Sequence, residues 1–252
     1  MEFAKYLKKK LLKERRLQKR PLLALTLARI YSFVHGLRAS LHLLFRFPYA
    51  YIASDVRLIG IARIGLGKNV AIGRGGWLNV NDRTSKGIAI DIGDNSFIGM
   101  RNYFSVGRKI VIRDYCLTAM NCSFIGSTHL YDDPMQAYIY TGVSLDSDIY
   151  VGANCFFGYG AQVIGNVRIG HGCVLGAGAV IRNDIPPFSL VVGNPAKVIK
   201  RFDFSLKQWV AWPCDSYTEG PPEAEYIEHL RQQHGFIIHP ISGAASRLGN
   251  IV

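Results

Sequence analysis

Several features that mark common classes of protein are missing from these 252 residues. The five cysteines contain no Cys-x-x-Cys pair, which disfavours a zinc site or a disulfide framework. Arginines interrupt the apolar run from Leu22 to Phe47, so no uncharged stretch reaches the roughly eighteen residues that span a bilayer. These arginines, with no small-residue cleavage site after them, also disfavour a signal peptide. We therefore expect a cytoplasmic protein.

Acidic residues are scarce at the start of the chain. Residues 1–50 hold twelve Lys or Arg but only Glu2 and Glu14, whereas the other 202 residues hold eighteen basic and sixteen acidic side chains. Polar residues also share one face of a predicted amphipathic helix, namely His35, Arg38, His42 and Arg46. Residues 1–47 therefore either bind an anionic membrane surface peripherally or pack on the rest of the protein. Nucleic acid is not expected, because no aromatic residues interleave with the basic run.

A six-residue repeat is the clearest pattern present. Every sixth residue from Val151 to Ile181 is large and apolar. Six is a multiple of the strand period of two and does not match the helical 3.6, so each unit reads as a short strand. Three units would make a coil of about eighteen residues in a solenoid. The expected stacking pairs are Val151 on Ile169, Phe157 on Leu175 and Val163 on Ile181.

Four cysteines fall at a second inward position of the repeat, two residues before each large one. These are Cys116, Cys122, Cys155 and Cys173. A small side chain is needed there, so packing is the preferred interpretation. A zinc site of imidazoles is also disfavoured, because His129 and His171 lack a third partner. No metal is expected.

The segments GAGAVI at 176–181 and GNPAKVIK at 193–200 resemble the bacterial hexapeptide-repeat acyltransferases over residues 55–201. This resemblance implies a left-handed parallel β-helix, although the usual crossover preference would favour a right-handed coil. It also implies a homotrimer with sites between subunits and acetyl-CoA as acyl donor.

The expected organisation has three parts. Residues 1–50 form the basic helical segment, residues 51–201 form the mainly β acyltransferase domain, and residues 202–252 form a C-terminal cap and tail with a short helix at Glu223–Gln233. A loop insertion at 127–148 interrupts the repeat, and a shorter polar loop at 79–87 precedes it. Long excursions from a rigid solenoid commonly carry function.

His129 is the candidate catalytic base. It ends the segment FIGSTH, which resembles the stretch before the catalytic histidine of the sugar and polysaccharide O-acetyltransferase branch. An imidazole, whose ordinary pKa is near 6.5, can take the proton of a sugar hydroxyl as the oxygen attacks a thioester. A histidine in a polar loop is otherwise most often a surface residue.

Four residues are candidates for the acceptor side: Asn102, Asp132, Asp133 and Tyr138. Asn102 matches an acceptor-site asparagine of the family by position, and a polar ladder residue inside the coil is the equal alternative. The two aspartates could orient His129 or bind hydroxyls, or they could be turn residues before Pro134. Tyr138 is a candidate ring for stacking on a sugar.

The resemblance also implies a CoA groove built from Phe156, Ala177, Lys197 and Lys200. Relatives often carry arginine at the last two positions, so the phosphate contact could instead fall to Arg201. The expected function is O-acetylation of a sugar hydroxyl of a bacterial surface polysaccharide or its precursor. Alternatives are N-acetylation of a nucleotide-linked amino sugar and a non-catalytic β-helix scaffold.

Overall fold

The structure, a computed structural model, describes residue 43 and residues 45–234. The predicted amphipathic helix and the C-terminal tail therefore lie outside the described residues, apart from a few positions after residue 42. By its internal contacts the chain divides into two units, residues 1–48 and residues 49–252. The second unit holds the repeat and is described below by itself.

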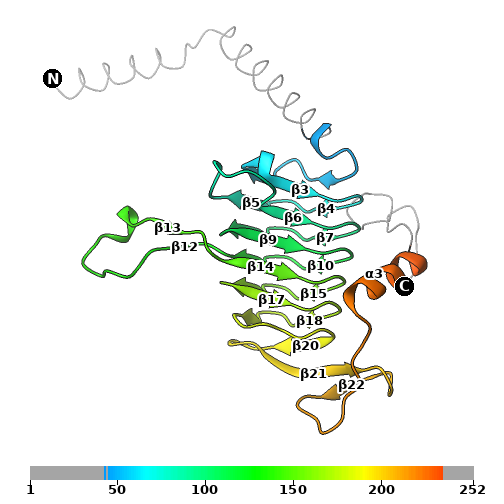
Figure 1. Cartoon of the computed structure of the whole chain (residues 1–252). Helices are drawn as coiled ribbons and strands as arrows, with labels where there is room; N and C mark the ends of the chain where they lie inside the picture. Colours follow the sequence, from blue (N-terminus) through cyan, green and yellow to red (C-terminus); the bar gives the residue numbers. More distant parts are fainter. Residues whose placement is uncertain (1–42, 44, 235–252) are drawn as a thin grey trace, which may run out of the picture. The chain divides into compact units, whose positions relative to one another are not determined.

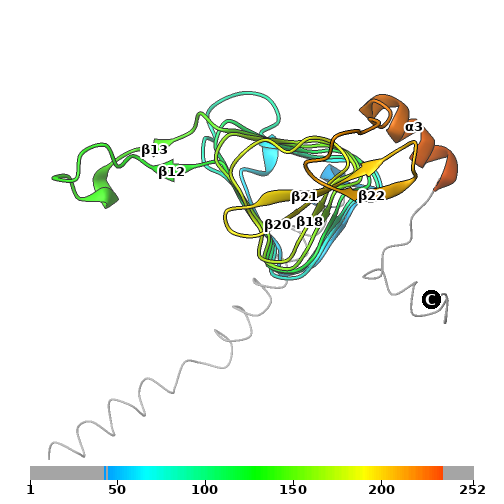
Figure 2. The same ribbon diagram turned by 90° about the horizontal axis from the view of Figure 1, so that it is seen from below.

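The body is a solenoid whose cross-section is a triangle, seen end-on in Figure 2. The chain visits three parallel sheets in turn, here named A, B and C. Sheet A is completed by two antiparallel strands, and its members are β1 (Tyr51–Ile52), β4 (Ala71–Ile72), β7 (Phe97–Ile98), β10 (Leu117–Thr118), β15 (Phe156–Phe157), β18 (Val174–Leu175), β20 (Ser189–Val192), β21 (Lys197–Asp203) and β22 (Gln208–Ala211).

The other two sheets are built in the same way from one strand of each coil. Sheet B contains β2 (Arg57–Ile59), β5 (Trp77–Val80), β8 (Tyr103–Val106), β11 (Ser123–Ile125), β16 (Gln162–Ile164) and β19 (Val180–Ile181). Sheet C contains β3 (Ile64–Leu66), β6 (Ile90–Ile92), β9 (Lys109–Ile112), β14 (Asp148–Val151) and β17 (Val167–Ile169), with the 3₁₀ turn η1 (Ile61–Arg63) before β3. We call the turns between sheets the A–B, B–C and C–A corners.

The register confirms the stacking that the repeat predicts. Val151 pairs with Ile169, Phe157 with Leu175 and Val163 with Ile181 on successive coils, and all six side chains are buried. The four repeat cysteines are also buried among these residues as free thiols. Burial raises the pKa of Cys122 to about 11, so this thiol stays protonated and acts as an apolar filler. The prediction of a mainly β solenoid is thus confirmed.

Both long insertions leave the solenoid at the B–C corner. The first, residues 81–89, separates β5 from β6, and the second separates β11 from β14. The second carries the antiparallel strands β12 (Thr128–His129) and β13 (Val143–Ser144), with the 3₁₀ turn η2 (Tyr138–Tyr140) between them. We call residues 127–147 the arm, which projects sideways from the coils in Figures 1 and 2.

After the last coil the chain turns back on sheet A and then crosses to the C–A corner. Aromatic side chains pack on this returning segment. Phe202 of β21 and Trp209 of β22 have ring centroids 5.6 Å apart, and Phe204, just after β21, lies 4.7 Å from Phe188 of the last turn. Helix α3 (Glu223–Gln233) has the predicted bounds. The part of the chain that the structure describes contains no helix of the length and hydropathy needed to span a membrane.

Helix α3 packs along the C–A corner. The carboxylate of Glu223 accepts a hydrogen bond from the backbone N–H of Ala153, at 2.8 Å, and another from the Tyr150 hydroxyl. At the other end of the helix, Arg231 pairs with Asp114 at 3.0 Å. These contacts join the helix to two neighbouring coils and hold it against the solenoid, as Figure 1 shows.

Candidate functional site

His129 lies at the base of the arm, in the short strand β12. It is opposite Val143 of β13, and its side chain is exposed. Strand β11 ends at Ile125, so only three residues separate the rigid coil from this histidine. The fold therefore ties the predicted base closely to the B–C corner while leaving its imidazole open to a reactant.

A polar cluster lies at the root of the arm and was not recognised in the sequence. The side-chain amide of Asn81 donates to the hydroxyl of Ser127 at 2.7 Å, to the hydroxyl of Ser105 at 3.2 Å and to the backbone carbonyl of Val106 at 3.0 Å. The hydroxyls of Ser105 and Ser127 are 2.6 Å apart. These contacts join the two insertions, and we call Asn81, Ser105 and Ser127 the root cluster.

The first insertion is anchored by Asp82 as well. Its carboxylate accepts hydrogen bonds from Ser85 and Thr84, which hold its pKa well below the usual range. Arg63, at the preceding coil, pairs with the same carboxylate at 3.3 Å. These contacts fix the backbone next to Asn81 and so hold its side chain in position.

The outer part of the arm carries three of the residues predicted to bind the acceptor, Asp132, Asp133 and Tyr138. Asp133 accepts a hydrogen bond from the backbone N–H of Met135, at 2.9 Å, which is the turn role that the sequence left open. Asp132 and Tyr138 are exposed. The arm also exposes large apolar side chains, namely Leu130, Tyr131, Met135, Ile139, Tyr140 and Val143. Such a concentration on a single arm is typical of a surface that contacts a ligand or another chain.

Asn102 lies inside the coil and does not reach the arm. Its side-chain amide donates to Thr118 and to the carbonyls of Gly99 and Ala119, and its oxygen accepts from the N–H of Cys122. All its hydrogen-bonding groups are thus engaged within the protein. The geometry favours the ladder role over the acceptor-binding role.

The predicted donor-side residues lie on sheet A and at the A–B corner. Phe156 faces outward from β15, and Ala177 is exposed in the turn after β18. Lys197 and Lys200 are exposed on β21, beside the last coil. A Cβ added to Gly158 would lie 2.6 Å from the backbone nitrogen of Ala177, so glycine is required for the two coils to approach at this corner.

Arg201 does not join this group. Its side chain is only 7% exposed and donates to the carbonyl of Pro187 at 3.1 Å. The guanidinium also lies 4.1 Å from the ring centre of Tyr217 and 4.9 Å from that of Trp212. The expectation that Arg201 could replace a lysine at a phosphate is therefore not supported by its position.

Sheet B separates His129 from the residues predicted to bind the donor. His129 lies beyond the B–C corner, whereas Ala177 lies at the A–B corner. Within one chain the two halves of the predicted site therefore do not meet.

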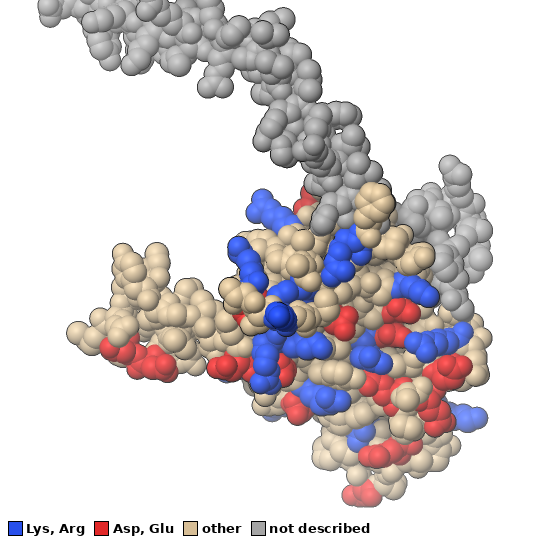
Figure 3. All heavy atoms as spheres, turned by 45° about the horizontal axis from the view of Figure 1, so that its top comes forward, with Lys and Arg blue, Asp and Glu red and all other residues tan. Residues whose placement is uncertain are grey.

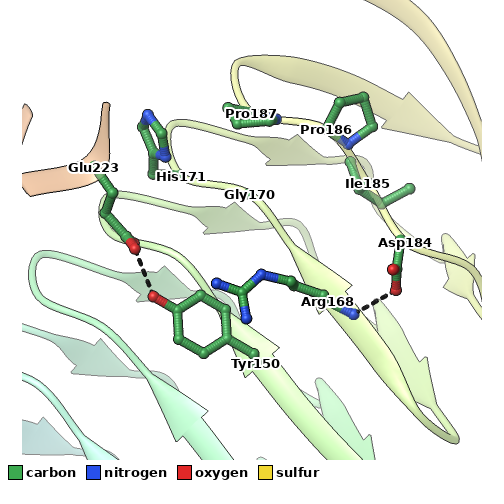
Figure 4. A pocket seen from close by; sticks show the side chains of 9 residues that line it. All are labelled: Tyr150, Arg168, Gly170, His171, Asp184, Ile185, Pro186, Pro187 and Glu223. Atoms are coloured by element: carbon green, nitrogen blue, oxygen red, sulfur yellow. Dashed lines mark hydrogen bonds between the residues drawn. The ribbon is translucent and has the colours of Figure 1, made fainter. Parts of the chain in front are cut away.

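A separate hollow of about 510 Å³ lies on sheet C beside α3 (Figure 4). The Arg168 guanidinium stacks 4.0 Å from the ring centre of Tyr150, and burial with the Glu223 hydrogen bond raises the pKa of Tyr150 to about 12. His171 borders the hollow, but a ring nitrogen hydrogen-bonds with the Pro221 carbonyl at 2.9 Å, which fits a structural role. Among residues 43 and 45–234, no three His, Cys, Asp or Glu side chains are grouped to hold a metal ion.

Part of the repeat matches a known family model. A model of the bacterial transferase hexapeptide (six repeats) matches residues 148–183. The resemblance to the hexapeptide-repeat acyltransferases is confirmed. Outside the block from 148 to 183, the hexapeptide strands continue in the less regular coils that precede it.

Two relatives extend the likeness beyond the hexapeptide block. A Staphylococcus aureus protein, assigned but not established as an acetyltransferase, is 38% identical over 124 residues, which are 49% of this chain and 60% of the relative. A Mycobacterium tuberculosis protein with the same kind of assignment is 33% identical over 135 residues, or 52% of this chain and 44% of the relative. The matched part is thus less than two thirds of either relative.

A solved structure supports the hexapeptide fold alone. A mutant of the N-acyltransferase AntD from Bacillus cereus, in complex with dTDP and coenzyme A, superposes with a TM-score of 0.54 at 17% identity. The superposition covers 73% of this chain and 88% of that one.

Proposed function

We propose that this protein is an acetyl-CoA-dependent O-acetyltransferase with His129 as its general base and a sugar hydroxyl as its acceptor. The observation that carries the proposal is the placement of His129, which is exposed, is separated from a strand of the coil by three residues, and lies two residues after Ser127 of the root cluster. A base must be held in position and still be reachable, and this geometry provides both. The left-handed sense of the β-helix is part of this proposal, since the family implies it.

The reaction needs one proton acceptor and one acyl donor. The His129 imidazole takes the proton from the acceptor hydroxyl as its oxygen forms a bond to the thioester carbonyl carbon of acetyl-CoA. The tetrahedral intermediate then collapses, the carbon–sulfur bond breaks, and the imidazolium returns the proton to the departing thiolate. The products are the acetyl ester and free CoA, with the histidine regenerated.

The donor would lie along the A–B corner and sheet A. There the exposed backbone at Ala177 offers hydrogen-bonding groups, Phe156 offers a flat apolar face, and Lys197 and Lys200 offer positive charge for phosphates. No acidic partner lies within 4.0 Å of either lysine in the part of the chain that the structure describes. Both charges therefore remain available for an anionic ligand.

A homotrimer would bring the two halves of the site together. Each copy would place its arm against the A–B corner of the next, with sheet B on the inner side. The outward face of sheet B suits such a contact, because Trp77 and Tyr103 form an edge-to-face pair 5.4 Å apart there and Ile125 and Ile164 are half-buried. The exposed apolar residues of the arm would then be covered by the neighbouring copy.

The acceptor is proposed to be a surface polysaccharide or its precursor. Tyr138, Asp132 and Asp133 on the arm would contact its sugar ring and hydroxyls. A peripheral position on the inner face of the cytoplasmic membrane, through residues 1–47, fits a precursor assembled there.

Purified protein should release CoA from acetyl-CoA when the glycan acceptor is supplied. His129→Ala should lower kcat at least 1000-fold, because the hydroxyl loses its proton acceptor, while the oligomer and its binding of CoA remain intact. The matched control is His229→Ala, which removes an exposed histidine from α3 and should leave kcat unchanged. Full activity in the His129→Ala protein would refute the assignment.

A further inference from the structure

The solenoid is electrically polarised along its length. Residues 49–113, which form the first coils, contain ten Lys or Arg and four Asp or Glu, a net charge of +6. Residues 114–234 contain seven basic and twelve acidic side chains, a net charge of −5. Figure 3 shows the same division, with blue atoms gathered over the upper coils and red atoms more frequent below.

The excess positive charge reaches all three corners of the first two coils. Lys68 is exposed at the C–A corner, Arg57 and Arg74 at sheet B and the A–B corner, and Arg83 and Lys86 on the first insertion at the B–C corner. Arg74 pairs with Asp55 at 3.5 Å. Within the described residues, the remaining four cations make no ion pair within 4.0 Å, and we call Arg57, Lys68, Arg83 and Lys86 the end cations.

Aromatic side chains are exposed at the same end. Tyr49 is 70% exposed and Tyr51 is 45% exposed, both in the first coil. Tyrosine and tryptophan favour the head-group region of a bilayer, because their rings are apolar and their polar atoms remain hydrated. Cations with exposed tyrosines suit a lipid surface, and the test below distinguishes this ligand from single-stranded nucleic acid, which the same side chains could bind.

The chain enters the solenoid at this end. Tyr49 belongs to the first coil, so residues 1–48, with their twelve basic and two acidic residues, are covalently attached there.

We propose that the first-coil end of the solenoid is itself a docking surface for anionic lipid head groups. Strands of neighbouring coils are about 4.8 Å apart, so the first two coils lie within about 10 Å of a surface that they touch. The Debye length is about 8 Å at physiological salt, and the acidic half begins about three coils away, beyond that distance. The anionic head groups therefore attract the basic end, while salt screens them from the acidic half. This proposal is independent of the acyl-transfer reaction.

The test compares two charge-matched variants of the full chain. One replaces three end cations, Lys68→Gln, Arg83→Gln and Lys86→Gln, and the other replaces three exposed cations of the acidic half, Arg168→Gln, Arg182→Gln and Lys207→Gln. Both keep residues 1–48 unchanged. Binding is measured by co-sedimentation with vesicles of phosphatidylcholine alone and with about 30% phosphatidylserine, over a range of salt.

Each cation near an anionic surface contributes roughly a fivefold increase in partition coefficient. We expect the end-cation variant to bind phosphatidylserine vesicles at least tenfold more weakly than wild type, and the control variant to bind within about twofold of wild type. Equal binding by the two variants would show that residues 1–48 act alone and would overturn the proposal. Tight binding of single-stranded RNA without binding to vesicles would overturn it in favour of nucleic acid. Circular dichroism melting establishes that both variants are folded.

Discussion

The side-chain amide of Asn81 hydrogen-bonds to the hydroxyl of Ser127, 2.7 Å away, although the two residues are 46 positions apart in the chain. Asn81 opens the first insertion and Ser127 opens the arm, two residues before His129. One amide thereby links the two excursions that leave the B–C corner.

Removal of this link should slow catalysis more than it weakens donor binding. Asn81→Ala deletes three hydrogen bonds at the arm root, and we expect kcat to fall about 10-fold to 100-fold with less than a threefold change in KM for acetyl-CoA. Ser127→Ala should act through the same contact. In a double-mutant cycle the two effects should therefore couple by about 1 kcal/mol. Strict additivity would show that the residues act separately.

Asn102 should matter for stability and not for the reaction. Asn102→Ala leaves the Cys122 N–H and the carbonyls of Gly99 and Ala119 without their partner in the core, at a cost of about 2–4 kcal/mol. The urea midpoint should fall, while kcat per folded molecule should stay within twofold of wild type. A protein of unchanged stability with lost activity would instead place Asn102 in the acceptor site.

Two glycines allow neighbouring coils to approach closely, and they should differ in their effect on CoA. A Cβ at Gly158 would lie 2.6 Å from the nitrogen of Ala177, and one at Gly152 would lie 2.4 Å from the nitrogen of His171. Both alanine variants should lower the melting temperature, because backbone must shift in each. Only Gly158→Ala should raise the KM for acetyl-CoA, at least fivefold, because Gly152 lies at the C–A corner. Similar KM values in the two variants would argue against donor binding at the A–B corner.

The contact between Tyr150 and Glu223 should make the docking of α3 sensitive to alkaline pH. The pKa of Tyr150 is raised to about 12, first by burial and then by the Glu223 carboxylate, from an ordinary value near 10. A raised pKa stabilises the fold fully below about pH 10, and this contribution is lost as pH rises towards 12. Urea midpoints between pH 9 and pH 12 should therefore fall more steeply for wild type than for Tyr150→Phe. If the two curves are parallel, ionisation of Tyr150 does not weaken the fold and this prediction is wrong.

The sequence was most informative where each residue's position determines its surroundings. In the hexapeptide block, alternation places Val151 and Phe157 inward whatever the rest of the chain does, so their stacking partners eighteen residues later could be predicted. The bounds of α3 followed from Pro222 before it and the short helical pattern after it.

The sequence was less informative where unequal insertions change the spacing. The meeting of Asn81 with Ser127 depends on the length of two coils and two loops, which no periodic pattern specifies. The burial of Arg201 could not be predicted either, because Trp212 and Tyr217 contact it only after the chain has turned back as β22. In both cases the deciding contact comes from a distant, non-repeating segment.

Strands β2, β5, β8 and β11 form four successive rungs of sheet B between the chain's entry and the arm. At about 4.8 Å per rung, the arm leaves the body about 14 Å from the first coil. The number of coils before the arm thus fixes the distance between His129 and a ligand bound at the basic end. Deletion of one coil would shorten that distance by about 5 Å and, if the acceptor is a glycan held at that end as proposed, would change which of its units meets the imidazole.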